Sequence, residues 1–301
     1  MNKPDTALTT PLGDQLDFSQ PVRGEAIAIG TGFEATSFKH SGFAGLMDPI
    51  VMVDHFVMSL PTFGEHPHAG MSAVSVLFED STGVFNSKDS LGNNDDLLPG
   101  DLYWLKAGKG VTHDEKPLHG GTAHGLQIFV NLPSKSKQDA PVATHVSSSD
   151  IPVIESPLYR VRVVLGESNA VKGPHSPSLP LTILDATLNA EGLYNHAVSG
   201  LQAIWIYAAT GNASFSIGEK SFDLSAGEAM AIHIDMEQTQ LSLKSQSGAH
   251  IVVLQGEPIR EQFVQRGPFV MSNCAELNAV EDAHKRGMLG SINSAQHCTT
   301  N

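Results

Sequence analysis

The chain has 301 residues and a mass of 32.0 kDa, enough for two domains at about 150 residues each. Its 41% hydrophobic and 17% charged content is that of an ordinary globular protein and excludes a disordered, collagen-like or coiled-coil chain. There are 18 Lys and Arg against 32 Asp and Glu, so the net charge is −14. Because so acidic a chain repels phosphate backbones, we expect no direct binding to nucleic acid.

The sequence also bears on where the protein resides. No apolar stretch approaches the ~20 residues that a membrane-spanning helix needs, so we expect no membrane association. Residues 1–18 lack the apolar core of a signal peptide. Cys274 and Cys298 are the only cysteines and do not make a disulfide framework. These features predict a cytoplasmic protein.

Strand patterns dominate the chain. Short runs rich in β-branched and aromatic residues, most of them bounded by Gly, Pro, Asn or Asp, predict strands at 72–78, 126–132, 181–188, 201–209, 213–217 and 250–254. Many short strands with frequent turns favour an all-β sandwich or barrel over alternating βαβ units.

One short helix is expected at the C-terminal end. Asn273 can cap it with Glu276 three residues later, and Gly287 can end it. One face of this helix would carry Leu277, Val280 and His284.

A polar, Ser-rich segment at 133–157, with four prolines, divides the chain near its middle. Residues 98–107 and 225–232 share a short sequence pattern, a turn with Gly followed by an acidic residue and an apolar strand. This similarity fits two similar domains in tandem. We therefore predict an N-terminal metal-binding domain at 1–140, a linker at 141–157, and a C-terminal domain at 158–301 without an intact metal site.

Two short motifs carry the chemistry: His66-Pro67-His68 and His113-Asp114-Glu115. Residues i and i+2 of a strand point to the same face, so each motif can present two donors together. On neighbouring strands, three imidazoles and one carboxylate would converge, a set that suits Fe, Ni, Cu, Mn or Zn and disfavours Ca or Mg. Four protein ligands leave two open positions on an octahedral ion, which favours a redox-capable Fe(II)-type centre. On spacing alone, ordinary surface or hydrogen-bonded histidines remain the alternative.

Other histidines have weaker patterns. His55 lies in an apolar run and is expected to be buried and hydrogen-bonded, while His119 and His124 are expected in a Gly-rich loop. In the second half, His196, His233 and Asp235 imitate a two-histidine, one-carboxylate set, but Tyr194 stands where a paired His would be.

Long stretches of the sequence resemble the pirin family of the cupin superfamily. The motifs are HPH, DSLGN, AGKGVTH-x-E and GLQ-x-x-VNLP in the first half and GEPIREQFVQRGPFVMSN near the end. The resemblance implies a bicupin, with two tandem cupin-type β-sandwich or barrel domains and a metal, usually iron, only in the N-terminal one. It also implies that the metal ligands are His66, His68, His113 and Glu115, and that a monomer is the default state.

The sequence departs from the family pattern beside these ligands. Family members typically continue HPH with Arg-Gly-Phe-Glu, where this chain has Ala69, Met71 and Ser72 around the glycine. A His usually stands where this chain has Ser87. The lost Arg and Glu would remove an ion pair together, which the fold should tolerate.

The resemblance leaves two functions open, and an enzyme that acts on another small molecule is a third candidate, because a fold does not fix a function. Some bacterial members resemble quercetin 2,3-dioxygenase, which opens a flavonol with O2 and releases carbon monoxide. We expect such an enzyme here, with a small aromatic substrate, O2, Fe(II), and Glu115 as the general base. A cavity for the ring would be lined by Val74, Val76, Leu126 and Ile128. The alternative is a non-catalytic, iron-dependent regulator that acts through a protein partner.

Overall fold

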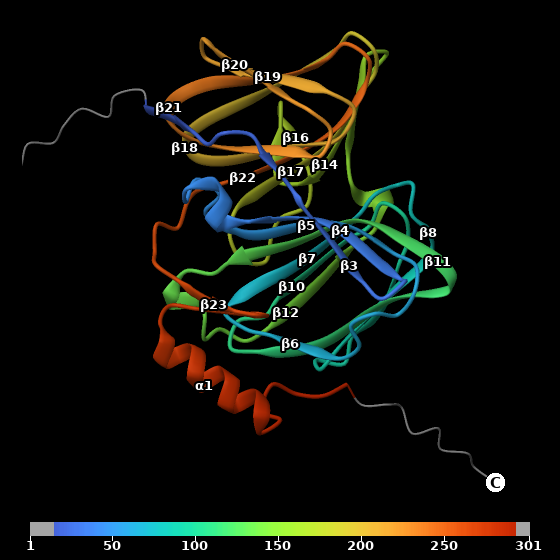
Figure 1. The fold of residues 1–301 in the computed structure, drawn as a ribbon, viewed down its shortest axis with the longest axis vertical. Helices are drawn as coiled ribbons and strands as arrows, with labels where there is room; N and C mark the ends of the chain where they lie inside the picture. Colours follow the sequence, from blue (N-terminus) through green and yellow to red (C-terminus); the bar gives the residue numbers. More distant parts are fainter. Residues whose placement is uncertain (1–14, 293–301) are drawn as a thin grey trace, which may run out of the picture.

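The computed structural model describes residues 15–292 and places two β domains one above the other (Figure 1). The C-terminal domain forms the upper half of this view, and the N-terminal domain lies below it. This is the predicted all-β, two-domain fold. None of the helices within residues 15–292 has the length and apolar content to cross a bilayer.

The N-terminal domain is a 10-stranded antiparallel sheet folded on itself. Its main path is β12 (Val142–Val146), β10 (Leu102–Lys106), β7 (Met71–Leu77), β11 (Val111–Asn131), β5 (Ile50–Met58), β4 (Phe33–Lys39) and β3 (Glu25–Ile29). Three further strands complete it: β6 (His66–His68), β8 (Thr82–Asp89) and β9 (Asn94–Leu97).

The long strand β11 joins the two layers of this domain. Its first half pairs with β6 and β8, and its second half pairs with β5 and β7. The register shifts between Leu118 and Thr122, where His119 and Gly120 have φ values of 53° and 78°. This left-handed turn redirects the strand, so β11 contributes to both walls of the space between the layers.

The C-terminal domain is a second 10-stranded antiparallel sheet. Its path is β13 (Val153–Ser156), β14 (Tyr159–Leu165), β17 (Leu181–Leu188), β22 (Ala249–Gly256), β18 (Gly192–Thr210), β21 (Glu228–Ser245), β19 (Ala213–Ile217) and β20 (Lys220–Leu224). Two small ribbons are β15 (Glu167–Ser168) with β16 (Val171–Lys172), and β23 (Val264–Arg266) with β24 (Phe269–Met271). Single 3-10 turns are η1 (His40–Phe43), η2 (Ser134–Ser136) and η3 (Ser148–Asp150).

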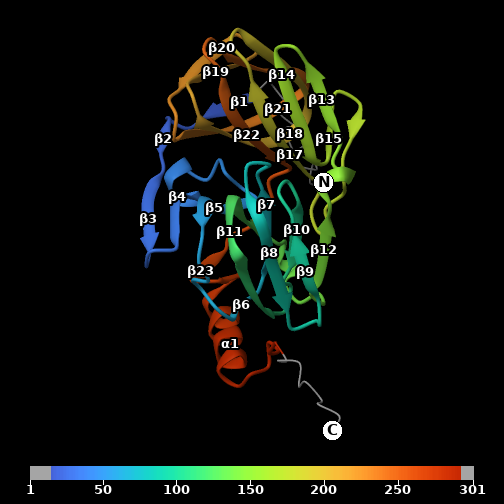
Figure 2. The same cartoon turned by 90° about the vertical axis from the view of Figure 1, so that its right-hand side faces the viewer.

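Each end of the chain packs on the domain formed by the other half. The early strands β1 (Gln15–Phe18) and β2 (Val22–Arg23) pair with β21 of the C-terminal sheet. The late elements β24 and α1 (Cys274–Lys285) pack below the N-terminal domain, near β6 (Figure 2). Between the domains, aromatic side chains such as Trp104 and Trp205 share one buried core. The two halves are therefore tied together in three places.

The predicted helix is confirmed as α1. The Asn273 side chain accepts a hydrogen bond from the Glu276 backbone nitrogen at 3.0 Å and caps the first turn. Leu277 and Val280 are buried against β24. His284, expected on the same face, lies at the exposed end of the helix, with its ring centroid 6.0 Å from that of Phe269 in the same cluster.

The segment at 133–157 is structured. It carries β12, which pairs with β10 of the N-terminal sheet, and β13, which pairs with β14 of the C-terminal sheet. The predicted domain boundaries stay a prediction, but strands begin inside the expected linker because its Val and Ile residues can complete sheet edges. Cys274 is exposed, and Cys298 lies outside the described residues.

Candidate metal centre and ligand cavity

Strand pairing brings the two predicted motifs together. In the β6–β11 ladder, His66 lies opposite His113, and His68 lies two positions along the same strand. The Nε2 atom of His113 is 2.9 Å from Nε2 of His66 and 2.9 Å from Nε2 of His68. One ligand atom from each of the three histidines lies within 4.8 Å of the others, a group that could hold a metal ion.

The protonation of these histidines fits that role. The Nδ1 atom of His66 lies 2.8 Å from the Gly64 carbonyl oxygen, which can only accept, so Nδ1 carries the proton and Nε2 presents a lone pair. Burial lowers the pKa of all three imidazoles, that of His68 to about 3 and that of His113 well below 6.5. The Nε2 atoms of the three rings converge on one point, and because two facing nitrogens can share at most one proton, a cation between them would give their lone pairs a common partner.

Glu115 lies next to this trio but outside it. Its Oε2 atom is 4.0 Å from Nδ1 of His113, while its Oε1 atom accepts a hydrogen bond of 2.8 Å from the Ser75 hydroxyl. Burial raises the pKa of Glu115 to about 7, against the opposing effect of Ser75. Its role as a fourth ligand stays a prediction.

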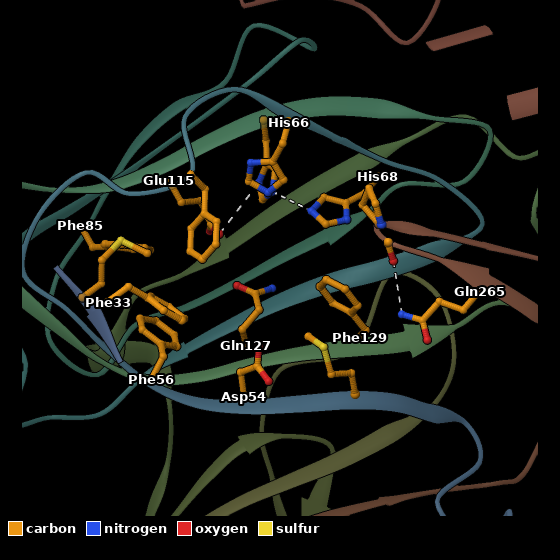
Figure 3. A pocket seen from close by; sticks show the side chains of 16 residues that line it. Phe33, Asp54, Phe56, His66, His68, Phe85, Glu115, Gln127, Phe129 and Gln265 are labelled. Carbon is orange, nitrogen blue, oxygen red and sulfur yellow. Dashed lines mark hydrogen bonds and ion pairs between the residues drawn. The ribbon is translucent and has the colours of Figure 1, made fainter. Parts of the chain in front are cut away.

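The histidines open onto a cavity of about 480 Å³, a size typical of small-molecule sites. Its walls are mainly aromatic and sulfur-containing, and Figure 3 shows these side chains around the opening beneath the histidines. The apolar lining residues are Phe33, Met52, Phe56, Met58, Phe63, Phe85 and Phe129, and two polar ones, Asp54 and Gln127, lie on the floor.

The C-terminal segment closes one side of this cavity. Gln265, Gly267 and Pro268 belong to its lining. The Ala69 nitrogen donates to the Pro268 carbonyl oxygen at 3.4 Å, next to His68 in the chain. A late part of the sequence therefore helps to position the β6 histidines.

The sequence-based expectation for the cavity wall was wrong. Val74, Val76, Leu126 and Ile128 are buried in the core between the two domains. Their neighbours on the opposite face of the same strands, Ser75, Gln127 and Phe129, point toward the site. Side chains alternate along a strand, and the pattern of these nearly all-apolar strands does not tell which face meets the partner domain. In β5 the lining residues are every second one, Met52, Asp54, Phe56 and Met58.

Two further histidines, His55 and His124, belong to a chain of side-chain hydrogen bonds between the two domains. His124 lies in β11, where its Nε2 is 2.8 Å from Nε2 of His55, and its Nδ1 is 2.8 Å from Asp80. His55 also contacts the Tyr207 hydroxyl of the C-terminal domain at 2.7 Å, as expected for a hydrogen-bonded residue. The expected loop was wrong for His124, because the chain continues there as strand, whereas His119 lies exposed at the turn where the β8–β11 register shifts.

The candidate ligands of the second half, His196, His233 and Asp235, do not lie together in one place. His196 is buried between Ser168 and Gln255, with 2.8 Å contacts to both side chains. His233 lies opposite Ala203, seven residues along β18 from His196. Within residues 15–292, the trio in the N-terminal domain is the group that could hold a metal ion.

The four residues that differ from the family pattern are all buried. Ala69 packs with Phe269 and the α1 residues, and Met71 packs with Val51 and Val270. The Ser72 hydroxyl lies 3.4 Å from that of Ser178. Small and apolar side chains thus occupy the positions where the family pattern has charges. The buried Ser87 lies opposite Glu115 in the β8–β11 ladder.

Two cupin domains, with a histidine group that could bind a metal in the first, define a bicupin. Family models agree: the Pirin model matches residues 27–130, and the Pirin C-terminal cupin domain matches residues 183–290. The chain belongs to the pirin family.

Individual relatives support this. A putative pirin-like protein of Arabidopsis thaliana is 31% identical over 81% of this chain and 89% of its own length. Human pirin is 30% identical over 77% of this chain and 79% of its own. Among solved structures, quercetin 2,3-dioxygenase from Acinetobacter baumannii has a TM-score of 0.79 and 26% identity, covering 92% of this chain and 99% of that one.

Proposed function

We propose that this protein is a mononuclear metal-dependent dioxygenase of the quercetin 2,3-dioxygenase type, acting on a flavonol-like enolic aromatic. The observation that carries the proposal is the convergence of three neutral imidazoles at one side of an aromatic cavity. The likeness to the Acinetobacter baumannii quercetin 2,3-dioxygenase over nearly the whole chain supports the same substrate class.

His66, His68 and His113 would hold the ion, with Glu115 as a fourth ligand. Fe(II) is the ion we favour, because imidazole and carboxylate donors suit it. When bound, the metal would supply a site at which the enolic hydroxyl becomes more acidic and O2 is activated.

The chain's own residues would bind and deprotonate the substrate. The phenylalanines of the cavity can contact both faces of a planar ring and keep water out. The Ser75 hydroxyl holds one oxygen of Glu115, so the carboxylate has a defined orientation from which it can take the proton of the enolic hydroxyl.

The first test is metal content. Protein purified without chelators should contain about one equivalent of iron, which His113→Ala should lose and the exposed His175→Ala should keep. Fe(II)-loaded protein mixed anaerobically with flavonol and then exposed to O2 should consume the flavonol and release CO. Absence of both with metal-replete protein would reject the proposed substrate class.

A regulatory role is the second candidate. The buried residues Ala69 and Ser72, which stand where the family has Arg and Glu, and Met71, which stands where it has Phe, favour this role because they alter the surroundings of the ligands. A regulator should change its surface between the Fe(II) and Fe(III) states and show no turnover. Limited proteolysis of the two states, beside the CO assay, separates the two candidates.

A further inference from the structure

Glu115 lies between the candidate metal centre and a hydroxyl group on the other layer of the domain. His113 and Glu115 stand two positions apart in the first half of β11, so their side chains point to the same face. Ser75 belongs to β7, which pairs with the second half of β11. The Ser75 hydroxyl reaches across and donates a hydrogen bond to Oε1 of Glu115 at 2.8 Å.

This hydrogen bond holds the carboxylate apart from the three histidines. Glu115 is not a member of the group whose ligand atoms lie within 4.8 Å of one another. Its Oε2 atom is 4.0 Å from Nδ1 of His113, not from the Nε2 atom that faces His66 and His68. Ser75 and Glu115 are only 2% and 7% exposed, so water does not compete for the bond between them. To bind an ion held by the histidines, Glu115 would have to leave Ser75.

A third side chain sets the direction of the Ser75 proton. Gln127 lies opposite Ser75 in the β7–β11 ladder, and its side-chain amide is 3.1 Å from the Ser75 oxygen. An ionised carboxylate only accepts hydrogen bonds, so the single hydroxyl proton goes to Glu115 and the amide turns its NH2 group to Ser75. In Figure 3, Glu115 lies beside the histidines and Gln127 below them. The two hydrogen bonds therefore run in one direction, from Gln127 through Ser75 to the carboxylate, and reinforce each other.

We propose that Ser75 is a positioning residue that competes with the metal ion for Glu115, so that Glu115 is a detachable ligand and the three imidazoles retain the ion. The inference rests on the proposed function, in which Glu115 is both a fourth ligand and the general base, and deepens it. It gives the carboxylate two positions, one on the ion and one on Ser75.

The sign of the effect on metal affinity distinguishes this role from ordinary support of a ligand. Loss of a residue that holds a ligand toward its metal weakens metal binding, typically by about 10- to 100-fold. Loss of a residue that holds the ligand away from the metal does the opposite, because Glu115 no longer has to break a hydrogen bond before it binds the ion.

The test is the Co(II) affinity of the full-length protein, measured by competition with a coloured chelator. Co(II) replaces Fe(II) here because it does not oxidise in air. Ser75→Ala and Ser75→Val should bind Co(II) about 10-fold more tightly than the wild type, the change expected for a hydrogen bond to a charged group. Ser75→Thr has nearly the volume of Ser75→Val but keeps the hydroxyl, so it should retain the wild-type affinity.

A matched control lies in the other domain. Ser245 is also buried, and its hydroxyl donates to the Asn212 carbonyl oxygen at 2.8 Å. Ser245→Ala removes a buried hydroxyl of the same kind far from the histidines and should leave the Co(II) affinity unchanged. Far-ultraviolet circular dichroism checks the fold of each variant, and the use of both Ser75→Ala and Ser75→Val keeps one informative if the other misfolds.

A double-mutant cycle assigns the gain in affinity to Glu115. Glu115→Gln removes the carboxylate for which Ser75 and the ion compete. In that background, Ser75→Ala should change the Co(II) affinity by less than about twofold, because the two residues act on metal binding only through each other. His113→Ala should abolish Co(II) binding in either background.

The outcomes separate this inference from the proposed function. An affinity equal to or weaker than wild type in both Ser75→Ala and Ser75→Val, or a gain that persists with Glu115→Gln, overturns the role of Ser75 and leaves the dioxygenase proposal standing. A gain that depends on Glu115, in a protein that releases no CO from flavonol, supports the role of Ser75 and rejects the dioxygenase. If the wild type binds no Co(II), both are rejected.

Discussion

Gly70 lies directly against the carbonyl oxygen of Val270: a Cβ atom at Gly70 would be 2.0 Å from that oxygen. The Gly70 φ of 72° is also one that residues with side chains rarely adopt. Because Gly70 follows His68 by two residues, this contact joins the candidate metal centre to the C-terminal segment that closes the cavity.

We therefore expect Gly70→Ala to lower the free energy of unfolding for two reasons, the left-handed backbone and the clash with Val270. Its cost should exceed that of the left-handed backbone alone. Gly30 is the matched control, because its φ is 60° and a Cβ there would have no heavy atom within 4 Å. Gly30→Ala should cost about 1–2 kcal/mol of unfolding free energy, and Gly70→Ala clearly more, as measured by urea unfolding. Equal losses would show that the Val270 contact adds nothing.

Lys137 holds the same region together from inside. Its buried Nζ donates to the Gly70 carbonyl at 2.8 Å, the Val270 carbonyl at 2.9 Å and the Asn131 side-chain oxygen at 2.6 Å. Burial lowers the pKa of Lys137 to about 8, so it is still mainly charged at pH 7.

Lys137→Met should leave these three buried oxygens without their donor and cost about 3 kcal/mol in unfolding free energy. The exposed Lys135→Met should change it by less than about 0.5 kcal/mol. Thermal unfolding of both variants in the same buffer checks this, and a Lys137→Met protein as stable as Lys135→Met contradicts it.

His55 is expected to make stability depend on pH. Burial, then the nearby His124 and His250, lower the pKa of His55 to about 4 from 6.5. Between these pH values the unfolded chain binds more protons than the folded one, so the free energy of unfolding falls as the pH falls from about 6.5 to about 4. The shift corresponds to at most about 3 kcal/mol.

The measurement is urea unfolding of chelator-treated protein at pH 7 and pH 4.5. His55→Gln removes the titrating group and should shrink the difference between the two pH values. His119→Asn, at an exposed position with positive φ that Asn tolerates, should leave the difference unchanged. A wild-type pH dependence in His55→Gln would mean that other groups cause it.

Metal binding should stabilise the folded chain through the histidine trio. A metal ion present at 100 times its dissociation constant adds about 2.7 kcal/mol to the unfolding free energy, and a chelator should remove this increment. His113→Ala should unfold at the same temperature with Fe(II) and with chelator, whereas His175→Ala should keep the difference. If the unfolding temperature of His113→Ala still rose with Fe(II), the metal would have to bind elsewhere.

The sequence by itself determined the fold class and the members of the histidine trio. Strand periodicity is a local property, and an H-x-H motif on a strand presents both rings to one face wherever that strand lies. The helix cap formed by Asn273 and Glu276 is equally local, since both residues belong to one turn.

Only the tertiary structure decided which face of each strand lines the cavity. Val74 and Ser75 are neighbours in the chain, but one packs against the C-terminal domain and the other reaches Glu115. Their assignment depends on which surface the partner domain covers, and no local pattern in a nearly all-apolar strand encodes that. The contact of Gly70 with Val270 depends in the same way on pairing between distant segments, whose register is set by packing of the whole molecule.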